Sequence, residues 1–192
     1  MPMSSHETFS KVIWIISHEK PHSILDVGCG DGFYGVAFRR YLDGNVADGR
    51  GLHKKDTWQH RIDGLEIYPD YKNPIHDYFY NQILWGVNAL EYFQNPKPSQ
   101  TYDCIFMGDI IEHLEKSDGM KMILNARNHL NENGILLIVT PIVKDQWHES
   151  PNDNPREAHL SLWDEYDFDF IEGFRLVNLL KNGKLFVMLA RE

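Results

Sequence analysis

The sequence is poor in cysteine and has no long hydrophobic run, and both absences narrow the class of protein. Only two of its 192 residues, Cys29 and Cys104, are cysteines, which excludes the disulfide framework of small secreted domains. Each lies at or inside an apolar run typical of a buried strand, so we expect reduced thiols in a cytoplasmic protein. The apolar stretch 12–16 is too short, and its flanks are wrong, for a signal peptide or a membrane span.

Repeats, low-complexity tracts and an excess of basic residues are also missing. No period of roughly 20–50 residues recurs, which excludes solenoids and propellers. Lys and Arg number 19 against 28 Asp and Glu, a net charge of −9, so nucleic acid is not indicated as a partner. The 42% of hydrophobic residues suffices for one core. We expect a single domain over 1–192.

Hydrophobic periodicity predicts strands that alternate with helices. Such an alternation indicates a parallel sheet with helices on both faces, an α/β fold. The expected strands are 23–27, 62–68, 83–87, 102–107 and 135–140, and the expected helices are 7–19 in the N-terminal segment 1–20, 34–42, 118–130 and a short one within 88–101.

Turn signals complete this outline. Asn131-Glu132-Asn133-Gly134 predicts the stop of the preceding helix, and the polar stretch 43–61 predicts a surface insertion. At the end of the chain, the apolar runs 175–180 and 185–190 flank an Asn-Gly pair, which is a strong hairpin signal. An α/β sheet that finishes in an antiparallel hairpin is an unusual combination.

A glycine-rich turn, Gly28-Cys29-Gly30-Asp31-Gly32, follows the first predicted strand. Glycines allow positive φ and leave no Cβ between backbone and ligand, and the next helix offers unpaired N–H groups. In open α/β sheets ligands bind beyond the carboxyl ends of the strands, where this turn lies. The dinucleotide spacing counted from the strand end requires glycine at position 33 and finds Phe33, which disfavours a nicotinamide-dependent oxidoreductase.

Acidic residues follow two other predicted strands. Glu66 is placed to accept hydrogen bonds from both hydroxyls of a ribose, although a solvated strand-end carboxylate is the alternative. Gly108-Asp109 ends the fourth strand and faces the same crevice, before Ile110-Ile111-Glu112-His113-Leu114. The three strand ends together therefore predict one ligand site.

These segments resemble a known family. Ile24-Leu25-Asp26-Val27-Gly28-Cys29-Gly30-Asp31-Gly32 is similar to the first motif of class I S-adenosylmethionine-dependent methyltransferases, and Asp109-Ile110-Ile111-Glu112-His113-Leu114 is similar to their fourth-strand segment. The resemblance covers roughly residues 20–190. It implies a doubly wound seven-stranded sheet of order 3-2-1-4-5-7-6 with a C-terminal antiparallel hairpin. It also implies S-adenosyl-L-methionine as cofactor and S-adenosyl-L-homocysteine as product.

The resemblance implies roles for individual residues. The backbone of 28–30 would lie against the methionine part of the cofactor, and Asp26 would orient that turn or reach the α-amino group through water. Glu66 would hold the ribose and Ile67 would contact the adenine face. Asn88 stands where the family often has an aspartate that accepts from the adenine amino group. The implied cofactor-binding residues are Asp26, Gly28, Cys29, Gly30, Gly32, Glu66, Ile67, Asn88, Ala89, Gly108 and Asp109.

Methyl transfer from a sulfonium is an in-line displacement. Alignment of the two reactants can lower the barrier by about 7–11 kcal/mol, and a base adds typically about 10²–10⁴-fold for a hydroxyl acceptor. His113, one helical turn past Asp109, is the candidate base, since imidazole titrates near neutral pH. The alternative is that His113 only packs near the cofactor.

The segment 141–163 is the expected acceptor-side loop. Its polar character and its His and Trp residues suit a lid, although a solvated loop whose Trp residues cover the sheet is the alternative. The spacing of Asp145, His148 and His159 matches no standard ligand pattern, so no metal is expected. The candidate substrate-binding residues are Tyr71, Trp147, His148, His159 and Trp163.

The sequence therefore predicts transfer of a methyl group from S-adenosyl-L-methionine to oxygen or nitrogen of a small-molecule or peptide acceptor. The alternatives are a non-catalytic S-adenosylmethionine or nucleotide-binding module and, less favoured, the oxidoreductase. No membrane partner is expected. The first helix carries Trp14 on an apolar surface and could serve as a lid or as the contact of a homodimer.

Overall fold

A computed structural model describes residues 8–44, 54–95, 98–142 and 154–192. Its seven strands form one sheet of order β3-β2-β1-β4-β5-β7-β6, which confirms the order that the resemblance implied. Neighbours are parallel from β3 to β5, while β7 is antiparallel to both β5 and β6. The strands are β1 (Ser23–Val27), β2 (Arg61–Glu66), β3 (Gln82–Trp85), β4 (Tyr102–Gly108), β5 (Leu130–Pro141), β6 (Phe174–Asn182) and β7 (Lys184–Arg191).

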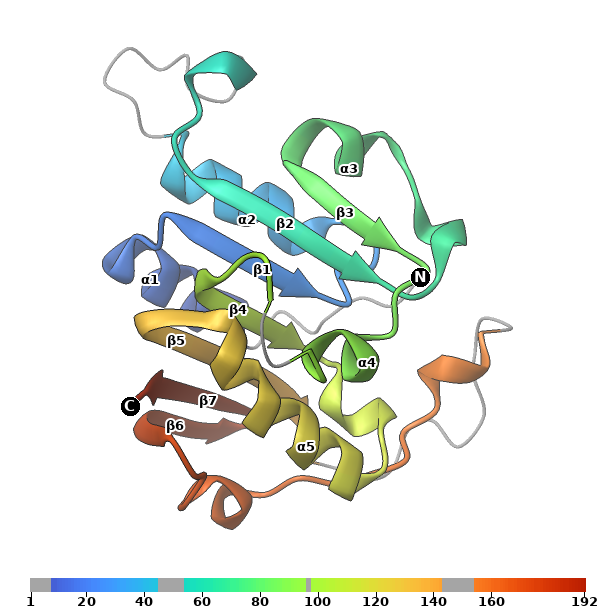
Figure 1. Ribbon diagram of the computed structural model, residues 1–192, viewed down its shortest axis with the longest axis vertical. Helices are drawn as coiled ribbons and strands as arrows, with labels where there is room; N and C mark the ends of the chain where they lie inside the picture. Colours follow the sequence, from blue (N-terminus) through green and yellow to red (C-terminus); the bar gives the residue numbers. More distant parts are fainter. Residues whose placement is uncertain (1–7, 45–53, 96–97, 143–153) are drawn as a thin grey trace.

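Helices cover both faces of the sheet, and each face has its own hydrophobic core. In Figure 1, α4 and α5 lie in front of the sheet, and α1 and α2 lie behind it. No helix in the described ranges has the length and hydropathy needed to cross a bilayer. The helices are α1 (Phe9–Glu19), α2 (Phe33–Leu42), α3 (Pro74–Phe79), α4 (Ala89–Phe93) and α5 (Lys116–Ala126), and the 3₁₀ turns are η2 (Lys55–Thr57), η3 (Pro69–Tyr71), η4 (Ile111–His113), η5 (Arg127–His129), η6 (Pro155–Glu157) and η7 (Glu165–Phe168).

The central strands are buried on both faces, which explains their continuous apolar runs. In β4, Ile105 and Met107 point into the core under α4 and α5, whereas Cys104 and Phe106 point into the core under α1 and α2. Alternate side chains of a strand point to opposite faces. Both faces of β4 therefore demand apolar residues, and polar groups are confined to the strand ends.

The predicted helix stop at Asn131–Gly134 is wrong. Helix α5 ends at Ala126 and β5 already begins at Leu130. Leu130 pairs with Tyr102, but Cys104 pairs with Ile135, so the intervening residues bulge out of the ladder. Asn133 adopts a φ of 62° there, a conformation that asparagine tolerates in turns and bulges alike.

Periodicity alone missed α3, because six residues are too few to display a helical repeat. The helix is specified by its cap instead: Asn73 Oδ1 accepts from Ile75 N (2.8 Å), His76 Nδ1 accepts from Asn73 N (3.1 Å), and Pro74 is the first helical residue. Strand β2 is also shorter than predicted, so that 67–68 lie beyond its end.

The terminal hairpin is tighter than predicted. Gly183 alone separates β6 from β7, with a φ of 67°, and Asn182 pairs with Lys184. Because β7 runs antiparallel to β5, Lys184 also pairs with Pro141 at the carboxyl end of β5. The hairpin thus places Lys184 at the carboxyl ends of the parallel strands, where the ligand site is expected.

A buried arginine ties α2 to its neighbours. The Arg39 side chain is fully buried and donates to Asp43 Oδ2 (2.6 Å) and His60 O (2.6 Å). It also donates to Phe79 O (3.1 Å) and Asn81 Oδ1 (2.9 Å). Arg39 therefore links α2 to the residues that precede β2 and β3.

We expect the Arg39→Met substitution to lower the free energy of unfolding by about 3–5 kcal/mol, because it removes the cation that pairs with Oδ2 of buried Asp43 and the donor to two carbonyl groups. The matched control is Arg40→Met, at the exposed next position of the same helix, where a surface change costs within about 0.5 kcal/mol. Urea denaturation of both variants measures the difference. Equal stability of the two would contradict this role of Arg39.

Candidate active site

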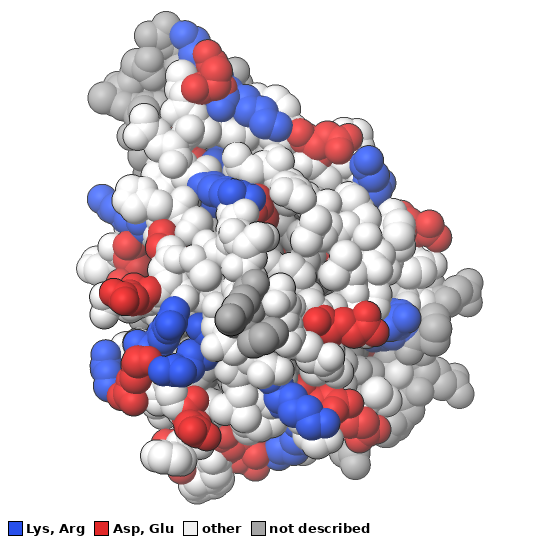
Figure 2. Space-filling view, in the orientation of Figure 1, with Lys and Arg blue, Asp and Glu red and all other residues white. Residues whose placement is uncertain are grey.

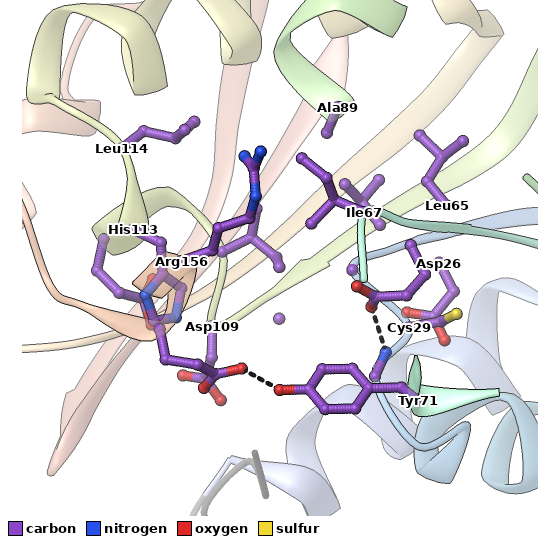
Figure 3. A pocket seen from close by; sticks show the side chains of 18 of the residues that line it. Asp26, Cys29, Leu65, Ile67, Tyr71, Ala89, Asp109, His113, Leu114 and Arg156 are labelled. Atoms are coloured by element: carbon purple, nitrogen blue, oxygen red, sulfur yellow. Dashed lines mark hydrogen bonds between the residues drawn. The ribbon is translucent and has the colours of Figure 1, made fainter. Parts of the chain in front are cut away.

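A cavity of about 850 Å³ lies at the carboxyl ends of the central strands. Small-molecule pockets typically measure about 300–1,000 Å³, so this one is large. Figure 3 shows Asp109 and His113 on one side of it and Asp26 and Cys29 on the other. The predicted residues that line it are Asp26, Gly28, Cys29, Gly30, Glu66, Ile67, Tyr71, Asn88, Ala89, Gly108, Asp109, His113 and His159.

The glycine turn wraps over the end of β2. Gly28 N and Cys29 N donate to Leu65 O (2.8 and 3.1 Å), and Gly30 N donates to Glu66 Oε2 (2.9 Å). Gly28 and Gly30 have φ values of 66° and 54°, a region that glycine enters without the steric cost of a Cβ. The backbone of the turn is thereby held at the cavity wall.

Glu66 stands at this junction with little exposure to solvent. Its other oxygen, Oε1, accepts from Tyr68 N (2.8 Å), and burial raises the pKa of the carboxyl group above its usual value. Each carboxylate oxygen can accept a second hydrogen bond. Glu66 can therefore hold the turn and still accept from a ligand in the cavity.

Asp26 is buried and bonds a tyrosine instead of the turn. Tyr80 Oη donates to Asp26 Oδ2 (2.6 Å) and accepts from Gly35 N (3.1 Å). Burial raises the pKa of Asp26 to about 7, and the negative charges of Glu66 and Asp31 act in the same direction. The first β-strand thus ends in a carboxyl group that is poised to gain or lose a proton near neutral pH.

Two of the predicted cofactor residues have local structural duties. Asn88 Oδ1 accepts from Leu90 N (2.9 Å) and caps α4, so one lone pair of the amide oxygen is used. Gly32 is the N-cap of α2 with a φ of 90°, and a Cβ there would meet Ile75 Cγ2 at 2.9 Å. It starts the helix and is not among the residues that line the cavity.

Asp109 lies where β4 ends, in a left-handed conformation (φ 54°) that costs energy for a residue with a Cβ. Asp109 N donates to Val139 O (2.9 Å), and Lys184 Nζ forms an ion pair with Asp109 Oδ1. Asp109 Oδ2 is buried without a hydrogen-bond partner among the described residues. Strained backbone of this kind is typical of functional sites.

Glu112 is 1% exposed. Thr140 Oγ1 donates to its Oε2 (3.0 Å), while Oε1 has no partner in the described part of the chain. Burial and the charge of Asp109 raise its pKa to about 8. The Glu112 carbonyl accepts from Leu160 N (2.8 Å) and Ser161 N (3.1 Å), which anchors the segment after η6 beside the cavity.

That anchor brings two histidines together. The rings of His113 and His159 lie 5.0 Å apart, and His113 Nδ1 lies 3.2 Å from Ala158 O. Burial lowers the pKa of His159, and the neighbouring His113 lowers it further. His159 was expected on the acceptor side, and the structure places it against the candidate base.

The remaining candidate substrate-binding residues do not all lie at the cavity. Tyr71 lines the cavity and its Oη donates to Glu157 Oε1 (2.7 Å). Trp163 is 1% exposed in the core, where its Nε1 donates to Ser161 Oγ (2.9 Å), and it does not line the cavity. Trp147 and His148 lie outside the described residues.

Glu112 and Lys184 line the cavity and were not assigned a role from the sequence. Glu112 could have been found as a carboxyl group that follows two isoleucines in the segment after the fourth strand, a signal for a buried functional carboxyl. Lys184 is 75 positions from Asp109, and only the antiparallel placement of β7 beside β5 brings it to the site. No local pattern around Lys184 carries that information.

The sequence matches a family model described as a methyltransferase domain over residues 7–171. The chain belongs to this methyltransferase family. It is accordingly an enzyme, and its cofactor is S-adenosyl-L-methionine. A search of the curated proteins finds no match to the sequence.

Solved structures share the fold at low sequence identity. An O-methyltransferase family protein from Burkholderia thailandensis is 14% identical with a TM-score of 0.62 and covers 95% of this chain, which spans only 55% of that protein. N-methyltransferase NodS from Bradyrhizobium japonicum, solved with S-adenosyl-L-homocysteine, is 14% identical with a TM-score of 0.61 (94% and 84% covered). A SAM-dependent methyltransferase from Aquifex aeolicus is 18% identical with a TM-score of 0.58 (89% and 82%).

We expect Asp26→Asn to change how stability depends on pH. The pKa of Asp26 rises from 3.8 to about 7 on folding, so between these values the folded state holds a proton that the unfolded state has released. Raising the pH through this window therefore destabilises the parent protein, by at most about 1.4 kcal/mol per pH unit, and not the variant.

The measurement is urea denaturation of both proteins without cofactor at about pH 4.5 and 6.5. The free energy of unfolding of the variant minus that of the parent should increase with pH. A difference that is constant over this range would show that Asp26 is not protonated in the folded protein.

Proposed function

We propose that the protein transfers the methyl group of S-adenosyl-L-methionine to an oxygen or nitrogen of a small-molecule or peptide acceptor, by in-line displacement. The observation that carries the proposal is a single large cavity with two kinds of wall. One wall combines the glycine turn with the Glu66 carboxylate, and the other gathers Asp109, His113 and His159.

The first wall fits the cofactor. Glu66 has unused lone pairs for the ribose hydroxyls, and the backbone of 28–30 would contact the methionine part. The Asp26 carboxyl would serve the α-amino group, whose positive charge favours the ionised form. Ile67 and Ala89 would contact the adenine, with Asn88 beside them. When bound, the cofactor supplies a methyl group already activated by the sulfonium charge.

The second wall would orient the acceptor and accept its proton. Because a carbonyl oxygen only accepts, the contact of His113 Nδ1 with Ala158 O (3.2 Å) places a proton on Nδ1. This leaves the Nε2 lone pair of neutral imidazole available as a base. Positioning contributes about 7–11 kcal/mol in such reactions, and a base adds about 10²–10⁴-fold.

A small acceptor suits the surroundings of this wall. Asn154 and residues 156–160 line the cavity, and Asn154 Nδ2 donates to Tyr71 Oη (3.2 Å), which joins this segment to the region after β2. Phe9 of α1 packs on Phe33, another lining residue, at 5.1 Å between ring centroids. Acidic and basic side chains are interspersed over the face in Figure 2, which does not favour a polyanionic acceptor.

We expect Glu66→Ala to weaken the binding of S-adenosyl-L-methionine at least tenfold, since it removes the acceptor for the ribose hydroxyls and for Gly30 N. Glu91→Ala, at an exposed position of α4, is the control. Calorimetric titration of each protein with S-adenosyl-L-methionine, S-adenosyl-L-homocysteine and NAD measures the effect. Unchanged affinity in Glu66→Ala would show that the assignment of the β2 end is wrong.

Transfer itself is tested with a cofactor that carries a labelled methyl group. The purified protein is incubated with a panel of small metabolites and peptides, and both labelled product and S-adenosyl-L-homocysteine are measured. We expect equal amounts of the two. Cofactor binding without turnover on any acceptor would favour the non-catalytic binding module.

A further inference from the structure

Glu112, His113 and His159 each direct one potential ligand atom into a common space. One carboxylate oxygen and two imidazole nitrogens lie within 4.8 Å of one another. Donor atoms on one tetrahedral ion, at bond lengths of about 2.0–2.2 Å, lie about 3.3–3.6 Å apart. The side chains therefore need to close by roughly an ångström to share an ion.

The buried carboxylate gives independent support. Glu112 is 1% exposed and its Oε1 has no hydrogen-bond partner among the described residues. Lys184, the nearby cation, is engaged by Asp109. A buried carboxylate oxygen without a partner is rare, because its desolvation is not compensated. A cation held between Glu112 and the two imidazoles would compensate it.

Hydrogen bonds to backbone carbonyl groups position both histidines for metal binding. With its Nδ1 proton directed to Ala158 O, His113 presents the lone pair of Nε2. Metal-binding histidines typically donate their other ring N–H to a carbonyl or carboxylate in this way. His159 is held beside it because Leu160 N and Ser161 N donate to the Glu112 carbonyl. The anchor thus fixes all the ligands relative to one another.

We propose that Glu112, His113 and His159 bind a divalent transition-metal ion in the active-site cavity, and that this ion holds a hydroxyl oxygen of the acceptor. Two imidazoles and a carboxylate suit Mn²⁺, Fe²⁺, Co²⁺ or Zn²⁺ better than Mg²⁺ or Ca²⁺, which prefer oxygen ligands. Three protein ligands leave coordination positions open. The sequence spacing was considered for His159 only together with Asp145 and His148, which lie outside the described residues. The structure places His159 beside Glu112 and His113.

The inference rests on the proposed function and narrows its acceptor to a hydroxyl compound. As a Lewis acid the ion favours loss of the hydroxyl proton, which passes to solvent water. The oxygen lone pair then forms the bond to the methyl carbon while the carbon–sulfur bond breaks, and its electron pair stays on sulfur. His113 acts here as a ligand, so no separate base is needed.

The test begins with protein stripped of metal by a chelator and titrated with Co²⁺, whose visible absorption reports nitrogen and oxygen ligands. We expect one Co²⁺ per chain, and at least tenfold weaker binding in His159→Ala and in Glu112→Gln. His18→Ala, at an exposed position of α1, is the matched control and should bind as the parent does. His159→Ala removes no buried carboxyl, so it keeps the test valid if Glu112→Gln misfolds.

No stoichiometric binding, or equal binding by His159→Ala and His18→Ala, would overturn the inference. Titration with S-adenosyl-L-homocysteine in the presence of chelator separates it from the proposed function. Binding of that ligand and methyl transfer without metal would leave the methyltransferase proposal standing and refute the metal site. Co²⁺ binding without any affinity for the nucleoside ligands would refute the proposed function instead.

Discussion

The Glu66 carboxylate joins the two strand ends on which the cofactor wall depends. It accepts from Gly30 N with one oxygen and from Tyr68 N with the other, so it fixes the glycine turn against the end of β2. An ionisable group buried at this point costs desolvation energy, which raises its pKa. The hydrogen bonds offset part of that cost, and ribose hydroxyls would offset more. The Glu66 carboxylate thus holds the local structure and would also serve the proposed binding of the cofactor.

The opposite wall of the cavity contains the carboxyl groups of Asp109 and Glu112, which have little access to solvent. Asp109 is neutralised by Lys184, whereas Glu112 keeps an oxygen without a partner. These carboxyl groups lie just beyond the end of β4, and the charge of Asp109 adds to burial in raising the pKa of Glu112. The segment after η6 bonds the Glu112 backbone and brings His159 to the same place. The acceptor wall is therefore a product of contacts between segments that are distant in the sequence.

Much of this arrangement follows from local chemistry. The apolar runs of β1 and β4, the glycines of the turn and the Asn-Gly pair of the hairpin each impose their structure nearly alone. The errors arose where a local signal had two physical outcomes. Asn133 suits a helix end and a strand bulge equally. The bulge forms in this protein because it lets residues 135–139 pair with β4 and β7. Helix α3 was missed because a cap, rather than periodicity, specifies it.

The sequence by itself predicted the proposed cofactor half of the site, because local patterns mark the strand ends that carry Asp26, Gly28 and Glu66, and β1 and β2 are neighbours in the sheet. Only the tertiary structure decided the other half. Lys184 and His159 reach the cavity through strand pairing and a backbone anchor, and Trp163 turns away into the core. A parallel sheet gathers strand ends that are far apart along the chain, and periodicity within any one segment cannot report which side chains will meet there.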